Sequence, residues 1–358
     1  MTEQSKPRPG VHSPRQSTAT RLVRQATGGT RFLVVLILLI SVFSFFSLSQ
    51  PRFFTHSNVE ALLTSASILW VVSIGLTFVM LTGGFDLSLG SLLALSGVVF
   101  GLCNLDLHLP AALSIPVTVV VGACLGGLVN GVLIGRLGLS FLIVTLGTLT
   151  LYRGLVNLIT NTKTRGISSS LLDRIAFSHL AGLPIPVWIM AATFVVALWI
   201  LSGTYFGRDV YAVGGNHVAA RLSGVRVPST IVAVYAIAGA LAALGGVLET
   251  ARVGAVSPGI GQTIIFDATA AVLLGGTSFA GGVGGVGGTA VAVIFLATLQ
   301  NGLAVAGVQS FWQQVITGAI LIVAVLIEWA QRGDSPLRRH RPDPDTHPTP
   351  LIRGPGRL

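Results

Sequence analysis

Few residues in this sequence have the types and spacing that could do chemistry. It holds no phosphate-binding GxxxxGK(S/T) loop, no HExxH, no GxSxG and no cluster of Cys and His at metal-ligand spacing. Residues 282–287 (GVGGVG) fit the dinucleotide pattern GxGxxG, but they lie between apolar segments, and no acidic residue follows until Glu328. We therefore expect no catalytic residue, no metal site and no cofactor bound by this chain.

Two acidic residues stand in otherwise apolar surroundings. Asp86 lies in TGGFDLSLGS, where it or Ser88 could cap the next helix, or where the carboxylate could be a polar group on a transport path. Asp267 lies in GQTIIFDATAAVLLGG and is the best candidate for a buried polar group, although a position at the outer face near Arg252 or Glu249 would also explain it. A charge at the centre of a bilayer costs about 2.5–3.5 kcal/mol on insertion scales, so both acids need a structural reason.

Residues 204–228 form the longest polar connection between apolar segments. The pattern predicts an extended entry, a Gly-Gly-Asn turn, and a short amphipathic helix from His217 to Leu222 that Asn216 caps and Gly224 ends. A short helix of this kind suits docking into a groove of another protein, and a solvated basic loop is the alternative.

The composition indicates which class of protein holds these residues. Only 9% of the 358 residues are charged and 52% are hydrophobic, whereas soluble proteins carry about 25% charged residues. The net charge of +10 lies mostly in residues 1–31 and 332–358, so it does not indicate a nucleic-acid partner. The interior contains long uncharged runs, and a spanning helix needs roughly 20 apolar residues. These runs are 61–85, 87–105, 107–135, 175–207, 227–248 and 268–327.

We therefore predict an all-α polytopic integral membrane protein with about ten transmembrane helices. The predicted spans lie near 32–48, 59–82, 88–105, 111–135, 140–160, 185–203, 229–250, 262–279, 286–305 and 310–330. No small-residue cleavage site follows the first apolar run, so we expect an uncleaved span there rather than a signal peptide. Glu60 and Glu328 mark span ends in this scheme.

The chain divides into a disordered basic tail (1–31), a transmembrane domain (32–331) that includes the 204–228 loop, and a second tail (332–358). Basic residues concentrate in the tails and in alternate loops, which predicts both termini in the cytoplasm, beside the anionic leaflet of the membrane. A faint repeat relates residues 81–84 (LTGG) to 273–276 (LLGG), so an internal duplication is possible.

Several motifs, in order, resemble one known family. GGFDLSLGSLLALSG (83–97), VGGNHVAARLSGVRV (213–227), LLGGTSFAGGVGGVGG (273–288) and NGLAVAGVQSFWQQVITGAILIVAVLIEW (301–329) resemble the permease subunits of ribose/xylose-type bacterial ABC importers. The likeness extends from about residue 55 to 330. It implies a permease that dimerises or pairs with a similar permease, accepts a small sugar from a periplasmic binding protein, and is driven by a cytoplasmic ATPase that binds ATP-Mg.

The resemblance also implies which residues contact the ATPase. The GGNxxAARLSG segment is the family's coupling loop, although this chain has His217 where the family usually has an acidic residue. The implied coupling residues are Gly214, Gly215, Asn216, His217, Ala219, Ala220, Arg221, Leu222, Ser223 and Gly224.

A path for a sugar needs hydrogen-bonding groups and few charges. The candidates for the path or its gate are Asp86, Ser88, Asn130, Gln262, Asp267, Thr277, Ser278 and Asn301. We expect a multi-pass protein of the bacterial inner membrane that alternates between outward-open and inward-open states. A stand-alone secondary transporter or channel for a small polar solute is the alternative.

Overall fold

The computed structural model describes residues 18–331, with side chains from 32 to 330. The predicted tail 332–358 and the first 17 residues of the N-terminal tail lie outside the described residues. The first half of the described chain contains α1 (Thr18–Ser49), α2 (His56–Leu81), α3 (Leu89–Gly101), α4 (Ala111–Cys124), α5 (Val132–Gly135), α6 (Phe141–Thr160) and α7 (Ser170–Phe177). Two π-helical segments, Leu102–Asp106 and Leu125–Gly131, extend α3 and join α4 to α5.

The second half contains α8 (Ile185–Gly203), α9 (Tyr205–Gly215), α10 (His217–Leu222), α11 (Val227–Val253), α12 (Ile264–Leu274), α13 (Val286–Val305) and α14 (Ser310–Gln331). The four strands, β1 (Arg165–Gly166), β2 (His179–Leu180), β3 (Leu183–Pro184) and β4 (Ala255–Val256), have two residues each. Within the described residues, nine helices are long and apolar enough to cross a membrane. The prediction of an all-α polytopic membrane protein is confirmed.

The predicted span at 262–279 is wrong. α12 has only 11 residues, about 16 Å at 1.5 Å per residue, whereas the hydrocarbon core is about 30 Å thick. Glycines end it: Gly275 and Gly276 follow α12 directly, and Gly276 has a φ of +89°. Hydropathy counts these glycines as part of an apolar run, although they favour loops.

The predicted tail boundary at residue 31 is also wrong, because α1 begins at Thr18. Residues 18–27 contain no Pro or Gly and include the good helix formers Ala, Leu, Arg and Gln. The helix therefore continues beyond the apolar segment and through the glycine pair at 28–29.

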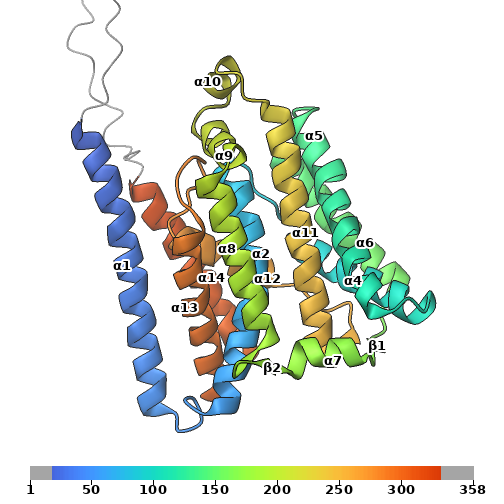
Figure 1. The fold of residues 1–358 in the computed structure, drawn as a ribbon. Helices are drawn as coiled ribbons and strands as arrows, with labels where there is room; N and C mark the ends of the chain where they lie inside the picture. Colours follow the sequence, from blue (N-terminus) through green and yellow to red (C-terminus); the bar gives the residue numbers. More distant parts are fainter. Residues whose placement is uncertain (1–17, 332–358) are drawn as a thin grey trace, which may run out of the picture.

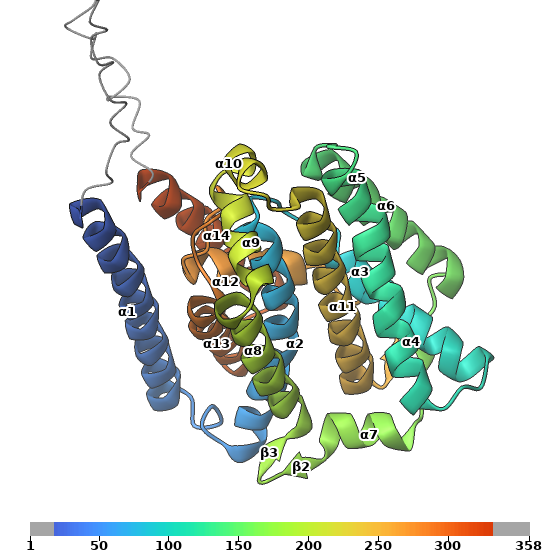
Figure 2. The same ribbon diagram turned by 45° about the horizontal axis from the view of Figure 1, so that its top comes forward.

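α2 and α11 form the centre of the helical bundle. α11 packs against α2, α3 and α4, and it lies between α2 and α4 in the turned view (Figure 2). In α2, 89% of the most apolar stretch is buried, against 11% in α14, so α2 is an interior helix and α14 a peripheral one. Glycines permit the tight crossing of α4 and α11, because a Cβ on Gly122 of α4 would overlap the carbonyl oxygen of Gly239 in α11.

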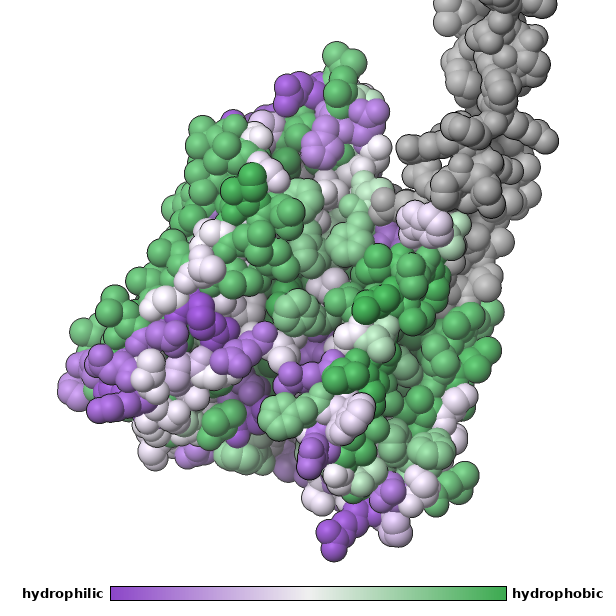
Figure 3. All heavy atoms as spheres, turned by 180° about the vertical axis from the view of Figure 1, so that it is seen from behind, coloured by the Kyte–Doolittle hydropathy of each residue, from purple (hydrophilic) through white to green (hydrophobic). Residues whose placement is uncertain are grey.

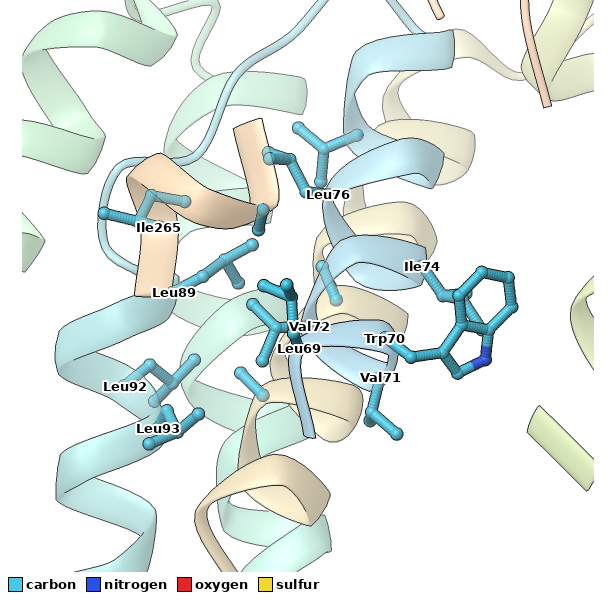
Figure 4. Close-up of a cluster of buried hydrophobic side chains, with 14 of the residues drawn as sticks. Leu69, Trp70, Val71, Val72, Ile74, Leu76, Leu89, Leu92, Leu93 and Ile265 are labelled. Atoms are coloured by element: carbon cyan, nitrogen blue, oxygen red, sulfur yellow. The ribbon is translucent and has the colours of Figure 1, made fainter. Parts of the chain in front are cut away.

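The buried apolar core joins α3 and α12 to α2. Leu89, Leu92 and Leu93 of α3 point toward Leu69 and Val72 of α2 (Figure 4). Ile265 of α12 lies in the same cluster and is 3% exposed. The core therefore fixes the starts of α3 and α12 beside one another, inside the bundle.

The two ends of the bundle differ. α10 projects at one end, where α1 begins and α14 ends, and the strands lie at the other (Figure 1). β1 pairs with β4, with Arg165 opposite Val256, and β2 pairs with β3 in a hairpin. Hydrophilic residues gather toward these ends, and apolar residues cover much of the surface between them (Figure 3). We call the two ends the α10 end and the strand end.

Candidate functional site

Asp86, Ser88 and Asn130 form one buried cluster, and all three are 0% exposed. The Asp86 carboxylate accepts hydrogen bonds from the backbone N–H of Ser88 at 2.8 Å and from the Ser88 hydroxyl. Asn130 donates its amide to Asp86 at 3.2 Å and to the Ser88 oxygen at 2.9 Å. Asp86 therefore accepts a backbone N–H in the turn before α3, but the predicted side-chain cap is not formed, because the N-cap residue of α3 is Ser88 and its side chain makes no capping hydrogen bond. The cluster ties this turn to the π-helical segment of residues 125–131.

A second polar cluster lies around Asp267 in the first turn of α12. The Gln300 amide of α13 donates to the Asp267 carboxylate at 2.8 Å and to the Thr317 hydroxyl of α14 at 3.3 Å. Cavities lie on both sides of Asp267 and Gln300, with volumes of ≈ 360 and ≈ 400 Å³. As predicted, Arg252 and Glu249 are near, because they line the first cavity.

The other predicted path residues lie in different surroundings. Asn301 lines the first cavity and exchanges two hydrogen bonds with Asn58 of α2, at 2.8 and 3.0 Å. Gln262 is exposed on the loop before α12. Asn130 and Asn301 belong to separate clusters.

Thr277 and Ser278 hold the glycine-rich loop 275–285 in place rather than facing the two cavities. The Thr277 hydroxyl accepts from the backbone N–H of Gly285 at 3.3 Å. The Glu328 carboxylate of α14 accepts from the Ser278 hydroxyl at 2.7 Å and from the backbone N–H of Phe279 at 2.8 Å. Glu328 is thus more than a span end, because it anchors this loop.

Tyr211 of α9 anchors the same loop from the other side. Its hydroxyl donates to the backbone carbonyl of Gly284 at 2.9 Å. Burial raises the pKa of Tyr211, so the hydroxyl keeps its proton near neutral pH. The loop is therefore held by both α9 and α14.

Residues 81–85, which include the first segment of the faint repeat, contact residues 279–282, which follow the second segment, at the α10 end and largely through backbone atoms. The N–H of Gly282 donates to the carbonyl of Leu81 at 2.9 Å, and the rings of Phe85 and Phe279 lie 5.3 Å apart. Gly214, near the end of α9, packs against the backbone of both segments. An added Cβ there would overlap the Leu81 oxygen and the Gly282 nitrogen. We call this contact the glycine junction. The duplication itself stays a prediction.

The predicted short helix His217–Leu222 is present as α10. The Asn216 side chain accepts from the N–H groups of Val218 and Ala219 at 2.9 and 3.0 Å, and Gly224 follows with a φ of +86°. The predicted extended entry is wrong, because residues 205–215 form α9, which Thr204 caps.

α10 exposes nearly all of its surface. Val218 is 69% exposed and Leu222 is 84% exposed, and Arg221 lies between them. Ala220 is buried, and His217 points one ring nitrogen at the Thr82 carbonyl at 3.2 Å. Of the other predicted coupling residues, Gly214 is buried in the junction, whereas Gly215, Asn216, Ala219, Ser223 and Gly224 are exposed.

Removal of the Asn216 cap should loosen α10. Asn216→Ala leaves two N–H groups without their acceptor, which typically costs about 1 kcal/mol. We expect amide hydrogen exchange across residues 217–222 to become roughly fivefold faster. Asn216→Ser, which retains a capping oxygen, is the matched control. Equal exchange rates in the two variants would contradict the capping role.

The sequence reasoning missed several residues of these sites, among them Gln300, Glu328 and Arg153. Arg153 of α6 donates to the carbonyls of Pro258 and Ile260 at 2.7 and 3.0 Å, and so holds the loop before α12. A basic residue inside the apolar segment 141–160 is a signal that could have identified it, since a charge there needs a partner.

Comparisons with known proteins agree with the order of motifs along the chain. Residues 58–325 match the family described as branched-chain amino acid transport system, permease component. The ribose import permease protein of Haemophilus influenzae is 37% identical over 302 residues, which cover 83% of this chain and 92% of that protein. No solved structure matches.

Two further relatives cover similar lengths. The ribose import permease protein of Bacillus subtilis is 37% identical over 312 residues, with 86% of this chain and 93% of that protein covered. The xylose transport system permease protein of Escherichia coli is 31% identical over 364 residues, with 84% and 92% covered. The chain, a multi-pass membrane protein, therefore belongs to the family of branched-chain amino acid transport system permease components.

Proposed function

We propose that the chain is the membrane permease subunit of a bacterial sugar importer in which a separate ATPase hydrolyses ATP. The observation that carries the proposal is α10, a helix that is capped and exposed. Through the glycine junction it is joined to one loop from each half of the chain, near residues 81–85 and 275–285. An exposed Leu222 beside Arg221 suits a protein groove better than water. The ribose and xylose permeases among the relatives support a monosaccharide as the solute.

The proposal assigns the α10 end to the cytoplasm. α1 begins and α14 ends at this end, and residues 1–31 and 332–358 carry six basic residues each. At the strand end, Arg165 and Arg252 are paired with Asp106 and Glu249. Both termini are then cytoplasmic, and the protein resides in the inner membrane.

The remaining partners follow from this arrangement. The strand end would receive sugar from a periplasmic binding protein, and a broad depression of ≈ 720 Å³ between residues 104–112 and 168–171 gives that protein a surface to contact. A second permease copy, or a similar permease, would complete the transporter. ATP and Mg²⁺ would bind to the ATPase alone. Import would then proceed by alternating access. Closure of the ATPase would shift the equilibrium between the outward-open and inward-open states through its contact with the α10 end.

Charge reversal at α10 tests the ATPase contact. We expect Arg221→Glu to reduce both ATPase association and sugar uptake by tenfold or more, because it places like or unpaired charge in the contact. Arg136→Glu is the control, since Arg136 is also exposed but directly follows α5, which lies at the α10 end away from α10. Association and uptake are measured in proteoliposomes that contain the permease, ATPase and binding protein of the same operon.

Two outcomes would contradict the proposal. Normal association and uptake with Arg221→Glu would exclude α10 as the contact. Sugar uptake by the permease alone, without ATPase, would favour a stand-alone transporter.

A further inference from the structure

The two cavities beside Asp267 share a polar wall. The first lies among α2, α11, α12 and α13, and the second among α12, α13 and α14, with Thr263, Asp267 and Gln300 lining both. Their volumes of ≈ 360 and ≈ 400 Å³ fall within the roughly 300–1,000 Å³ typical of small-molecule sites. The Gln300–Asp267 hydrogen bond therefore stands between two spaces that are each large enough for a small solute.

Most of the polar groups around the two cavities are neutral. Asn301 and Ser65 line the first cavity, and Gln313, Gln314 and Thr317 line the second. Amides and hydroxyls can both donate and accept hydrogen bonds, which matches the hydroxyl groups of a sugar. A solute in either cavity would exchange its water contacts for these groups.

The charged groups narrow the class of solute further. Arg252 lines the first cavity, but its guanidinium holds the Glu249 carboxylate through two hydrogen bonds of 2.9 and 2.6 Å. The carboxylate of an amino acid would need a free cation here, and it would be repelled by Asp267. The lining thus disfavours the branched-chain amino acids of the family description and favours an uncharged polyhydroxy solute.

We propose that Asp267 and Gln300 form a sugar-binding subsite between the two cavities, an inference that rests on the proposed sugar import. A sugar hydroxyl donates to the Asp267 carboxylate and takes the place of the Gln300 amide, which is then released to bond another sugar oxygen. Thr317 holds Gln300 in the absence of sugar, through the 3.3 Å hydrogen bond between them. The exchange connects the two cavities and moves the solute from one to the other.

Two variants test the subsite in the full transporter, with radiolabelled D-ribose and D-xylose as probes. Asp267→Asn keeps the shape but weakens a charge-assisted hydrogen bond, so uptake should fall about tenfold or more. Gly318→Phe fills the second cavity: Gly318 lines it, and an added Cβ meets nothing within 4 Å. Gly147→Phe is its control, because Gly147 of α6 has the same open space and lies outside both cavities.

The readouts separate the subsite from folding and from the proposed function. Sugar-independent ATPase activity and the melting midpoint should stay at wild-type values in Gly318→Phe and Gly147→Phe, while uptake falls only in the former. Uptake above half of wild type in both Asp267→Asn and Gly318→Phe would overturn the subsite. If Asp267→Asn fails to fold, Gly318→Phe decides alone. If the wild-type transporter takes up neither D-ribose nor D-xylose while its ATPase is active, the proposed import of a ribose- or xylose-like monosaccharide fails, whatever the variants do.

Discussion

Gly214→Ala should abolish transport, while the same change at the next residue should be tolerated. A Cβ on Gly214 would overlap the backbone of Leu81 and Gly282, whereas a Cβ on Gly215 meets nothing within 4 Å. Backbone atoms cannot rotate away, so the glycine junction must separate, at a cost of roughly 3 kcal/mol. In Gly215→Ala the reduced freedom of the unfolded chain stabilises the protein by up to about 1 kcal/mol.

The pair is measured by the melting midpoint of the purified permease and by uptake in the complete transporter. We expect Gly214→Ala to reduce uptake at least tenfold, even in preparations in which it still binds the ATPase. Such a result would assign the loss to transmission through the junction rather than to docking. Equal uptake by the two variants would show that the close contact is not required.

Asp86→Ala should be the most destabilising change of a single carboxylate. It leaves the Ser88 N–H, the Ser88 hydroxyl and one of the two N–H groups of the Asn130 amide without an acceptor in a fully buried site, while the other Asn130 N–H keeps the Ser88 oxygen. Each unsatisfied buried donor costs about 1–3 kcal/mol. The sum, at least about 3 kcal/mol, should lower the melting midpoint by roughly 6 °C or more.

Asp106→Ala is the matched control for this change. Asp106 is exposed and pairs with Arg165 at 2.8 Å, and exposed ion pairs contribute about 0–1 kcal/mol. We expect a shift of the midpoint of about 2 °C or less. Comparable shifts for the two variants would mean that the Asp86 cluster contributes little to the fold.

The long helices could be predicted because apolar runs of sufficient length have few alternatives in a membrane. α12 could not, since hydropathy treats glycine as apolar while the backbone of Gly276 leaves the helical region. α9 was missed because its Tyr and Val residues favour strands, although Gly207, Val210 and Gly214 recur at helical spacing and are buried.

The clusters were less predictable than the helices. Asp86 and Asn130 were each identified by type, but nothing in the sequence joins a residue in the loop before α3 to one 44 positions later in a helix. The sequence analysis selected Asn301 and missed Gln300. Successive helix positions point about 100° apart, and of these two residues Gln300 is the one that bonds to Asp267. Which face of a span meets the interior depends on packing between helices, and this information is not local.

The glycine junction also bears on how the protein can vary. A contact built from main-chain atoms has no rotamers that could absorb a displacement, so any movement of α9 must pass undamped to both loops. The contact in the glycine junction depends on where the backbone lies and not on the chemistry of any side chain. If the ATPase docks on α10 as proposed, the exposed residues of α10 can change together with that ATPase, while the movement passed to the bundle stays the same.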